Sequence, residues 1–67
     1  MAPRRLGTVL KMLREEHGLT QDTVAQRAMV TKPYLSQLET GKRKNPSLPV
    51  LKRLTKALGV PVATLLE

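Results

Sequence analysis

The stretch Leu19–Lys42, LTQDTVAQRAMVTKPYLSQLETGK, decides the fold of this 67-residue chain. Thr20 and Thr31 are good helix N-caps, because a threonine hydroxyl can accept a hydrogen bond from a free backbone N–H of the first helical turn. We therefore predict one helix that follows Thr20 and runs through about Ala28. A second helix should follow Thr31 and run through about Thr40.

The connection between these two helices is short. It consists of Met29, Val30 and Thr31, which is about the length of the turn in a DNA-binding helix-turn-helix. Gly41 stands after the second helix, where a helix C-terminus favours a residue with positive φ. The second helix of such a pair can enter the major groove of DNA. The sequence thus predicts a helix-turn-helix at about residues 20–41.

The charge of the chain favours a nucleic-acid partner. The formal net charge is +7, and the segment from Gly41 to Leu66 holds six basic residues and no acidic one. Clustered lysine and arginine on a small domain are the electrostatic footprint of nucleic-acid binding. An anionic membrane surface and a merely solubilising surface are the alternative explanations of the same charge.

Composition argues against several other classes of protein. The chain has no cysteine, one histidine and five acidic residues, so no metal-ligand spacing, nucleophile–base pair or cofactor motif is found. Its apolar runs are too short to span a membrane, and no apolar segment follows the basic N-terminus as it would in a signal peptide. We expect residues 1–67 to form one cytoplasmic, nucleoid-associated domain that is not an enzyme and binds no metal or cofactor.

Three more helices are predicted around the central pair. The first places apolar residues with helical spacing and ends at His17-Gly18. Its apolar residues are Leu6, Val9, Leu10 and Leu13. The fourth should follow Ser47 as N-cap, end at Gly59, and bury Val50, Leu51, Leu54 and Leu58. A short fifth helix should follow Pro61 and carry Val62, Leu65 and Leu66.

The helix after Thr31 has two distinct faces. At about 100° per residue, Leu35 and Leu38 fall together and should face the other helices. The opposite side carries Lys32, Pro33, Ser36, Gln37 and Thr40, with Tyr34 at its flank. Lysine can reach guanine, glutamine can bind adenine through two hydrogen bonds, and serine or threonine can serve either base. This face is therefore suited to the edges of bases, although neutral surface residues would look similar.

Nearly the whole chain, from Leu6 to Leu66, resembles the Cro and phage-repressor (XRE-type) family of helix-turn-helix domains. The matching motifs are Leu-Thr-Gln at 19–21, Val-Ala-Gln-Arg-Ala at 24–28, Tyr-Leu-Ser-Gln-Leu-Glu-Thr-Gly-Lys at 34–42, Leu-Thr-Lys-Ala-Leu-Gly-Val at 54–60 and Leu-Leu at 65–66. The resemblance implies an all-α, compact five-helix, lambda-repressor-like DNA-binding domain.

The resemblance also implies roles for individual residues. Contacts to bases would come from Lys32, Pro33, Ser36 and Gln37. Contacts to phosphates would come from Gln21, Thr31, Tyr34, Thr40, Lys42, Arg43 and Lys44. The family often pairs an arginine at the end of the first helix with a glutamate at the end of the third, and these positions hold Arg14 and Glu39. We therefore expect a structural ion pair there.

Two residues depart from the family pattern. Met29 stands where the turn usually has glycine, so either Met29 adopts a positive φ at a cost of about 1–2 kcal/mol or the turn takes another shape. Pro33 brings no flexible side chain to the start of the reading helix. Sparse base contacts by Lys32 and Gln37, supplemented by DNA shape, are the expected result.

Together, these observations predict a sequence-specific transcriptional regulator that binds double-stranded DNA, either a repressor or an autoregulator. We expect it to bind a palindromic operator as a homodimer, formed in solution or only on DNA. Pro61, Val62 and Leu66 are the candidate dimer residues. The alternative is an antitoxin-like or adaptor domain whose main partner is another protein.

Overall fold

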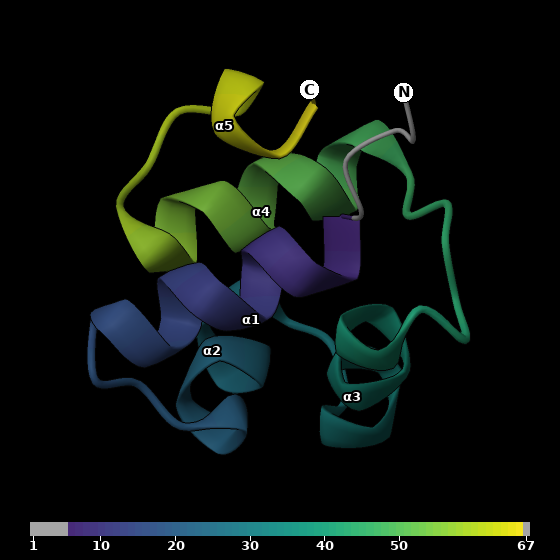
Figure 1. Ribbon diagram of the computed structural model, residues 1–67, viewed down its shortest axis with the longest axis horizontal. Helices are drawn as coiled ribbons and strands as arrows, with labels where there is room; N and C mark the ends of the chain where they lie inside the picture. The colour runs from purple at the N-terminus through teal and green to yellow at the C-terminus, as the bar shows by residue number, and fades with distance from the viewer. Residues whose placement is uncertain (1–5, 67) are drawn as a thin grey trace.

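The structure, a computed structural model, describes residues 6–66, which form five α-helices and no strand (Figure 1). The helices are α1 (Leu6–Glu16), α2 (Gln21–Ala28), α3 (Lys32–Thr40), α4 (Leu48–Leu58) and α5 (Ala63–Leu66). The prediction of an all-α, five-helix domain is confirmed. None of the helices within the described residues is long and apolar enough to cross a membrane.

The three predicted N-caps begin their helices. Each cap residue has extended backbone angles, and its hydroxyl oxygen accepts a hydrogen bond from the backbone N–H three residues later. The donor–acceptor pairs are Thr23 to Thr20 (3.1 Å), Tyr34 to Thr31 (3.1 Å) and Val50 to Ser47 (3.4 Å). Short-range chemistry therefore sets where α2, α3 and α4 begin.

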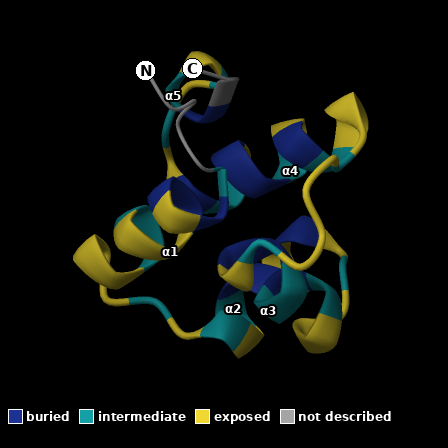
Figure 2. Cartoon of the chain, turned by 45° about the vertical axis from the view of Figure 1, so that its right-hand side comes forward, coloured by how far each residue is buried: buried dark blue, intermediate teal, exposed yellow. Residues whose placement is uncertain are grey.

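The core is formed by apolar side chains from all five helices. α2 packs against both α3 and α4, while α1 packs against α3 and α5. In Figure 2 the buried segments of these helices face one another, and the exposed segments lie outside. The buried apolar residues are Val9, Leu10, Val24, Ala25, Ala28, Leu35, Leu38, Leu51, Leu54, Leu58 and Leu65. This arrangement leaves one side of α3 uncovered.

Gly7 brings α1 very close to the end of α3. A Cβ atom built on Gly7 would lie 2.1 Å from the carbonyl oxygen of Leu38 and 2.7 Å from that of Glu39. Both neighbouring atoms belong to the backbone, so they cannot turn aside as a flexible side chain would. Any larger residue at this position would push α1 and α3 apart.

Some predictions of burial and helix bounds were wrong in detail. Val50 is only half-buried, because it lies at the edge of the core, whereas Thr55 is buried although no apolar pattern indicated it. Val62 lies in a turn before α5 rather than within the helix. The side chain of Leu66 lies outside the described residues.

Candidate nucleic-acid interface

The side of α3 that faces away from the core is polar. Leu35 and Leu38 are buried, as their spacing predicts. Lys32, Pro33 and Thr40 are exposed, whereas Ser36, Gln37 and Tyr34 are half-buried. We call Lys32, Pro33, Ser36, Gln37 and Thr40 the outer face of α3. The structure brings these five residues together on one side of a single helix.

Pro33 lies in the first turn of α3, where a backbone N–H has no partner within the helix. The ring therefore costs no helical hydrogen bond. Lys32 precedes it and places its Nζ 3.8 Å from Oδ1 of Asp22 on α2, an ion pair between two exposed side chains. Such a pair contributes little to stability and leaves the lysine free to exchange partners.

In the turn before α3, Met29 adopts the strained backbone conformation that was one of the two alternatives expected for it. Met29 has φ 58° and ψ 41°, in the left-handed region, and the residue is 73% exposed. The carbonyl of Ala25 accepts the N–H of Val30 at 2.9 Å, and the carbonyl of Gln26 accepts that of Met29 at 3.2 Å. Of the two alternatives for Met29, positive φ is therefore correct.

A side chain of α4 also contacts this turn. Nε of Arg53 donates to the carbonyl oxygen of Ala28 at 2.8 Å, at the C-terminus of α2. A cation is favourable there, because the last carbonyls of a helix carry partial negative charge. Sequence reasoning counted Arg53 only as part of the basic segment and missed this contact.

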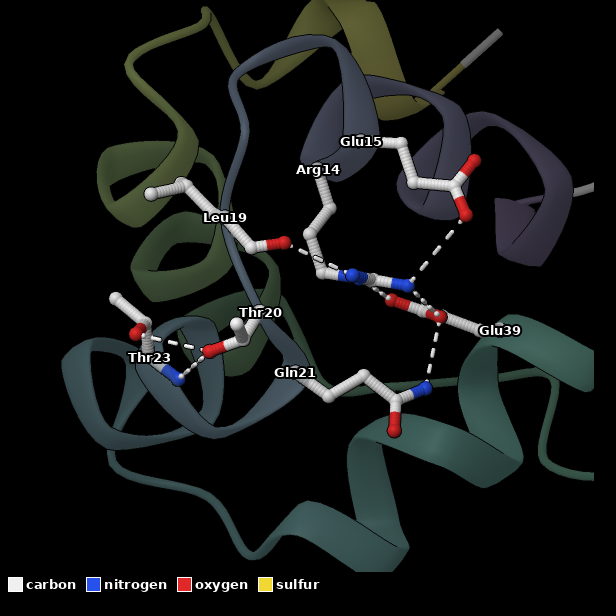
Figure 3. A network of polar contacts seen from close by, with 7 residues as sticks. All are labelled: Arg14, Glu15, Leu19, Thr20, Gln21, Thr23 and Glu39. Carbon is white, nitrogen blue, oxygen red and sulfur yellow. Dashed lines mark hydrogen bonds and ion pairs between the residues drawn. The ribbon is translucent and has the colours of Figure 1, made fainter.

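The inner side of α3 is held by a network of polar contacts centred on Glu39 (Figure 3). Oε2 of Glu39 accepts from Nε of Arg14 at 2.6 Å, and Oε1 accepts from Nη2 of Arg14 at 3.1 Å. Nη1 of Arg14 donates to the carbonyl of Leu19 at 2.9 Å. The side chains of Arg14 and Glu39 are 11% and 2% exposed. The network thus joins α1, the loop before α2, and α3.

The environment of Arg14 stabilises its charged form. The hydrogen bond to Glu39 and the attraction of that carboxylate raise the pKa of Arg14, although burial acts in the opposite direction. The folded state therefore stabilises the charged form of the guanidinium. Glu39 points inward and has no free oxygen on the outer face.

Gln21 takes part in the same network. Its Nε2 donates to Oε1 of Glu39 at 2.9 Å, which turns the amide toward α3 (Figure 3). The resemblance assigned Gln21 to a phosphate, and the structure adds an internal partner that the sequence did not suggest. Glu39 uses one of the two N–H groups of Nε2, so the second N–H and the backbone N–H at the start of α2 are the donors left to face a phosphate.

The three basic residues that follow α3 differ in their contacts. Lys42, Arg43 and Lys44 are all exposed. Arg43, however, folds back onto α3, where its guanidinium carbon lies 4.9 Å from the centre of the Tyr34 ring. Its Nε also donates to Oε1 of Gln37 at 3.3 Å. Arg43 therefore belongs to the outer face of α3 as much as to the loop.

The remaining candidate residues lie apart from α3. Pro61 is exposed and Val62 is half-buried, both in the connection between α4 and α5. Within residues 6–66, no three histidine, aspartate or glutamate side chains come together in a way that could hold a metal ion. The polar outer face of α3 and its basic flank are the chemically distinctive surface of the described chain.

Known proteins are similar to this chain in sequence and in fold. The family model described as "Helix-turn-helix domain" matches residues 5–67. The HTH-type transcriptional regulator DdrOP3 of Deinococcus deserti is 47% identical over 58 residues, which cover 87% of this chain and 44% of that protein. The HTH-type transcriptional regulator SinR of Bacillus subtilis is 37% identical over 62 residues, which cover 92% of this chain and 56% of that protein. The chain thus spans about half the length of these relatives.

Solved structures agree with the sequence comparison. A crystal structure of SinR in complex with DNA matches with a TM-score of 0.88 and 37% identity, covering 92% of this chain and 98% of that one. The restriction-modification controller protein C.AhdI of Aeromonas hydrophila matches with a TM-score of 0.86 and 33% identity, covering 91% of each chain. The chain belongs to the helix-turn-helix family of Cro and phage-repressor type.

Proposed function

We propose that this protein is a transcriptional regulator that binds double-stranded DNA sequence-specifically and inserts α3 into the major groove. The observation that carries this proposal is the outer face of α3. It offers amide, hydroxyl and ammonium groups, has no free carboxylate, and is followed directly by a basic segment. The names of the relatives, and the SinR complex with DNA, support the same function.

The proposed contacts divide into two groups with different consequences. Lys32, Pro33, Ser36 and Gln37 would contact base edges and so supply sequence preference. Contacts to phosphates would position α3 without reading the sequence. These would come from Gln21, Thr31, Tyr34, Thr40, Lys42, Arg43 and Lys44. Thr31 can keep its role as N-cap in such a contact, because its hydroxyl accepts from Tyr34 and still has a proton to donate.

The proposal includes a homodimer on a palindromic operator. One recognition helix reads only a few base pairs, which is too little for tight discrimination in a genome. Two copies related by a two-fold axis would place their α3 helices about 34–36 Å apart, one turn of DNA. Pro61, Val62 and Leu66 are proposed for the dimer surface because they lie away from α3. A repressor or autoregulator acting at the nucleoid in the cytoplasm is the biological role proposed.

Selection of bound sequences from a random duplex pool tests the proposal. We expect an enriched palindrome with half-sites one helical turn apart. Gln37→Ala should weaken binding to that duplex by about 1–3 kcal/mol and weaken binding to random DNA much less. Gln26→Ala is the matched control, because Gln26 is an exposed glutamine on α2 outside the proposed contacts.

Two results would contradict the proposal. A correctly folded protein that enriches no sequence would favour the antitoxin-like or adaptor role, in which another protein is the main partner. Sedimentation of the selected palindrome with increasing protein tests the dimer separately. We expect two chains per duplex, and saturation at one chain would rule out the homodimer while leaving DNA binding intact.

A further inference from the structure

Arg43 is attached to α3 at three points. Its backbone N–H donates to the carbonyl of Gln37 at 3.0 Å, its Nε donates to Oε1 of Gln37 at 3.3 Å, and its guanidinium lies 4.9 Å from the centre of the Tyr34 ring. A guanidinium is planar and stacks on an aromatic ring. These contacts hold the side chain beside Gln37 on the outer face of α3.

This contact fixes the orientation of the Gln37 amide. Arginine has only donors, so the Gln37 atom that faces Nε of Arg43 must be the oxygen. The amide Nε2, which is also a donor, is then the Gln37 group left to meet a ligand. The two amino groups of Arg43 are donors as well. Gln37 and Arg43, which we call the Gln37–Arg43 pair, therefore present donors together.

Nearby carboxylates do not disturb this pair. Glu39 is the acidic residue of α3. Its Oε2 accepts from Arg14, and its Oε1 accepts from Arg14 and Gln21. Asp22, at the other end of the helix, lies 3.8 Å from Lys32. The ion pairs found among the described residues do not include Arg43.

A donor-only pair distinguishes the two purines. Guanine offers two acceptors in the major groove, N7 and O6, whereas adenine offers the acceptor N7 and the donor N6 amino group. A lone glutamine can bind adenine through two hydrogen bonds because it has one acceptor and one donor. With one lone pair of its oxygen taken by Arg43 and the other donors of Arg43 beside it, Gln37 matches guanine better than adenine.

We propose that Arg43 determines specificity by orienting Gln37, so that the Gln37–Arg43 pair reads a guanine rather than an adenine. The inference rests on the proposed function, since it concerns how α3 reads DNA. It replaces the phosphate contact proposed above for Arg43 with a base contact, and so gives Arg43 a role different from that of Lys42 and Lys44. Those residues would act as charges, whereas Arg43 would act through the geometry of its planar donors.

The experiment repeats the sequence selection with charge-conserving variants. Gln37→Ala first identifies the operator position that Gln37 reads, as the position whose base preference it abolishes. The wild-type chain should prefer guanine there by about 5- to 150-fold over adenine. Arg43→Lys keeps the charge and the salt dependence of binding but loses the planar fork, so the preference should fall to about threefold or less.

Two controls separate orientation from charge. Lys44→Arg is a charge-conserving change at the next position and should leave the preference unchanged. A duplex with 7-deazaguanine at the identified position removes the N7 acceptor but keeps base pairing. That duplex should bind the wild-type chain at least about fivefold more weakly, and it should not weaken binding of Arg43→Lys further.

The outcomes distinguish this inference from the function on which it rests. Adenine at the identified position, or an unchanged guanine preference in Arg43→Lys, would overturn the role of Arg43 while leaving sequence-specific DNA binding intact. Absence of any enriched sequence for the folded wild-type chain would instead overturn the proposed function, and the inference with it.

Discussion

The two sides of α3 differ in what holds their side chains. On the inner side, Glu39 is almost fully buried and each of its oxygens is bound by a side chain from another helix. On the outer side, Gln37 and Tyr34 contact Arg43, which comes from the loop just beyond the same helix. The inner contacts fix where α3 lies, whereas the outer contacts only orient side chains. Stability and the proposed DNA recognition therefore reside on different faces of one short helix.

The largest expected effect comes from breaking the inner side at Arg14. Arg14→Met would leave the Glu39 carboxylate buried with Gln21 as its remaining side-chain donor. Such an uncompensated buried charge costs about 3–5 kcal/mol. Denaturant unfolding should show this loss of unfolding free energy, and the midpoint should fall accordingly.

A double-mutant cycle checks whether the cost arises from the pair. In Arg14→Met/Glu39→Met neither charge remains, so the double variant should lose less stability than the sum of the two single variants. Additive losses would mean that Arg14 and Glu39 are not coupled, contrary to their 2.6 Å contact.

Gly7→Ala should have the next largest effect, because of overpacking between α1 and α3. Its Cβ would overlap the carbonyl oxygens of Leu38 and Glu39, so α1 and α3 must separate. Overpacking of this kind costs about 1–3 kcal/mol, which for a domain of this size lowers the Tm by about 4–8 °C per kcal/mol. Thr8→Ala, at the exposed neighbouring position, is the control. A Tm unchanged by Gly7→Ala would show that the helices are not in such close contact.

Met29→Gly should be stabilising. The left-handed conformation costs a residue with a Cβ about 1–2 kcal/mol, and glycine avoids this cost but loses more entropy on folding, about 0.5–1 kcal/mol. The net gain in unfolding free energy should be about 0.5–1 kcal/mol. Met29→Ala removes the same exposed side chain but keeps the Cβ, so it should bring no gain. Equal effects of the two variants would place the cause in the side chain rather than in the backbone.

The smallest effect on stability is expected outside α3, at Lys42 and Lys44. Both are exposed, so changing either to alanine should alter the unfolding free energy by less than about 0.5 kcal/mol. Each change should nevertheless lower the slope of log affinity against log salt by about one. A changed base preference with an unchanged slope would contradict a role as phosphate contact.

Local chemistry made much of this fold predictable. The hydroxyls of Thr20, Thr31 and Ser47 cap helices through bonds that span three residues, so the sequence alone indicates where these helices begin. The apolar spacing in α3 likewise separates Leu35 and Leu38 from the outer face. The strain at Met29 was predictable as one of two alternatives, because the family that the sequence resembles usually has glycine at this position of the turn.

The remaining contacts depend on how the helices cross. Gly7 meets the end of α3 only because α1 and α3 approach closely, and no local pattern encodes that distance. Arg53 reaches the end of α2 from a position 25 residues further along the chain. In the sequence, nothing distinguishes Arg43 from the other cations of the loop. In the structure, its side chain lies over Tyr34 and against Gln37.

The separation of the two faces of α3 has a consequence for evolution. Among the described residues, no hydrogen bond or ion pair joins the side chain of Lys32, Ser36 or Gln37 to Arg14, Gln21 or Glu39. Substitutions at these three positions can therefore accumulate without the loss of stability that removes most mutations from a population. Under the proposed function, a lineage of such chains can acquire new DNA targets while it keeps the same scaffold. Substitutions at Arg14, Glu39 or Gly7 would lower stability, so they cannot accumulate in the same way.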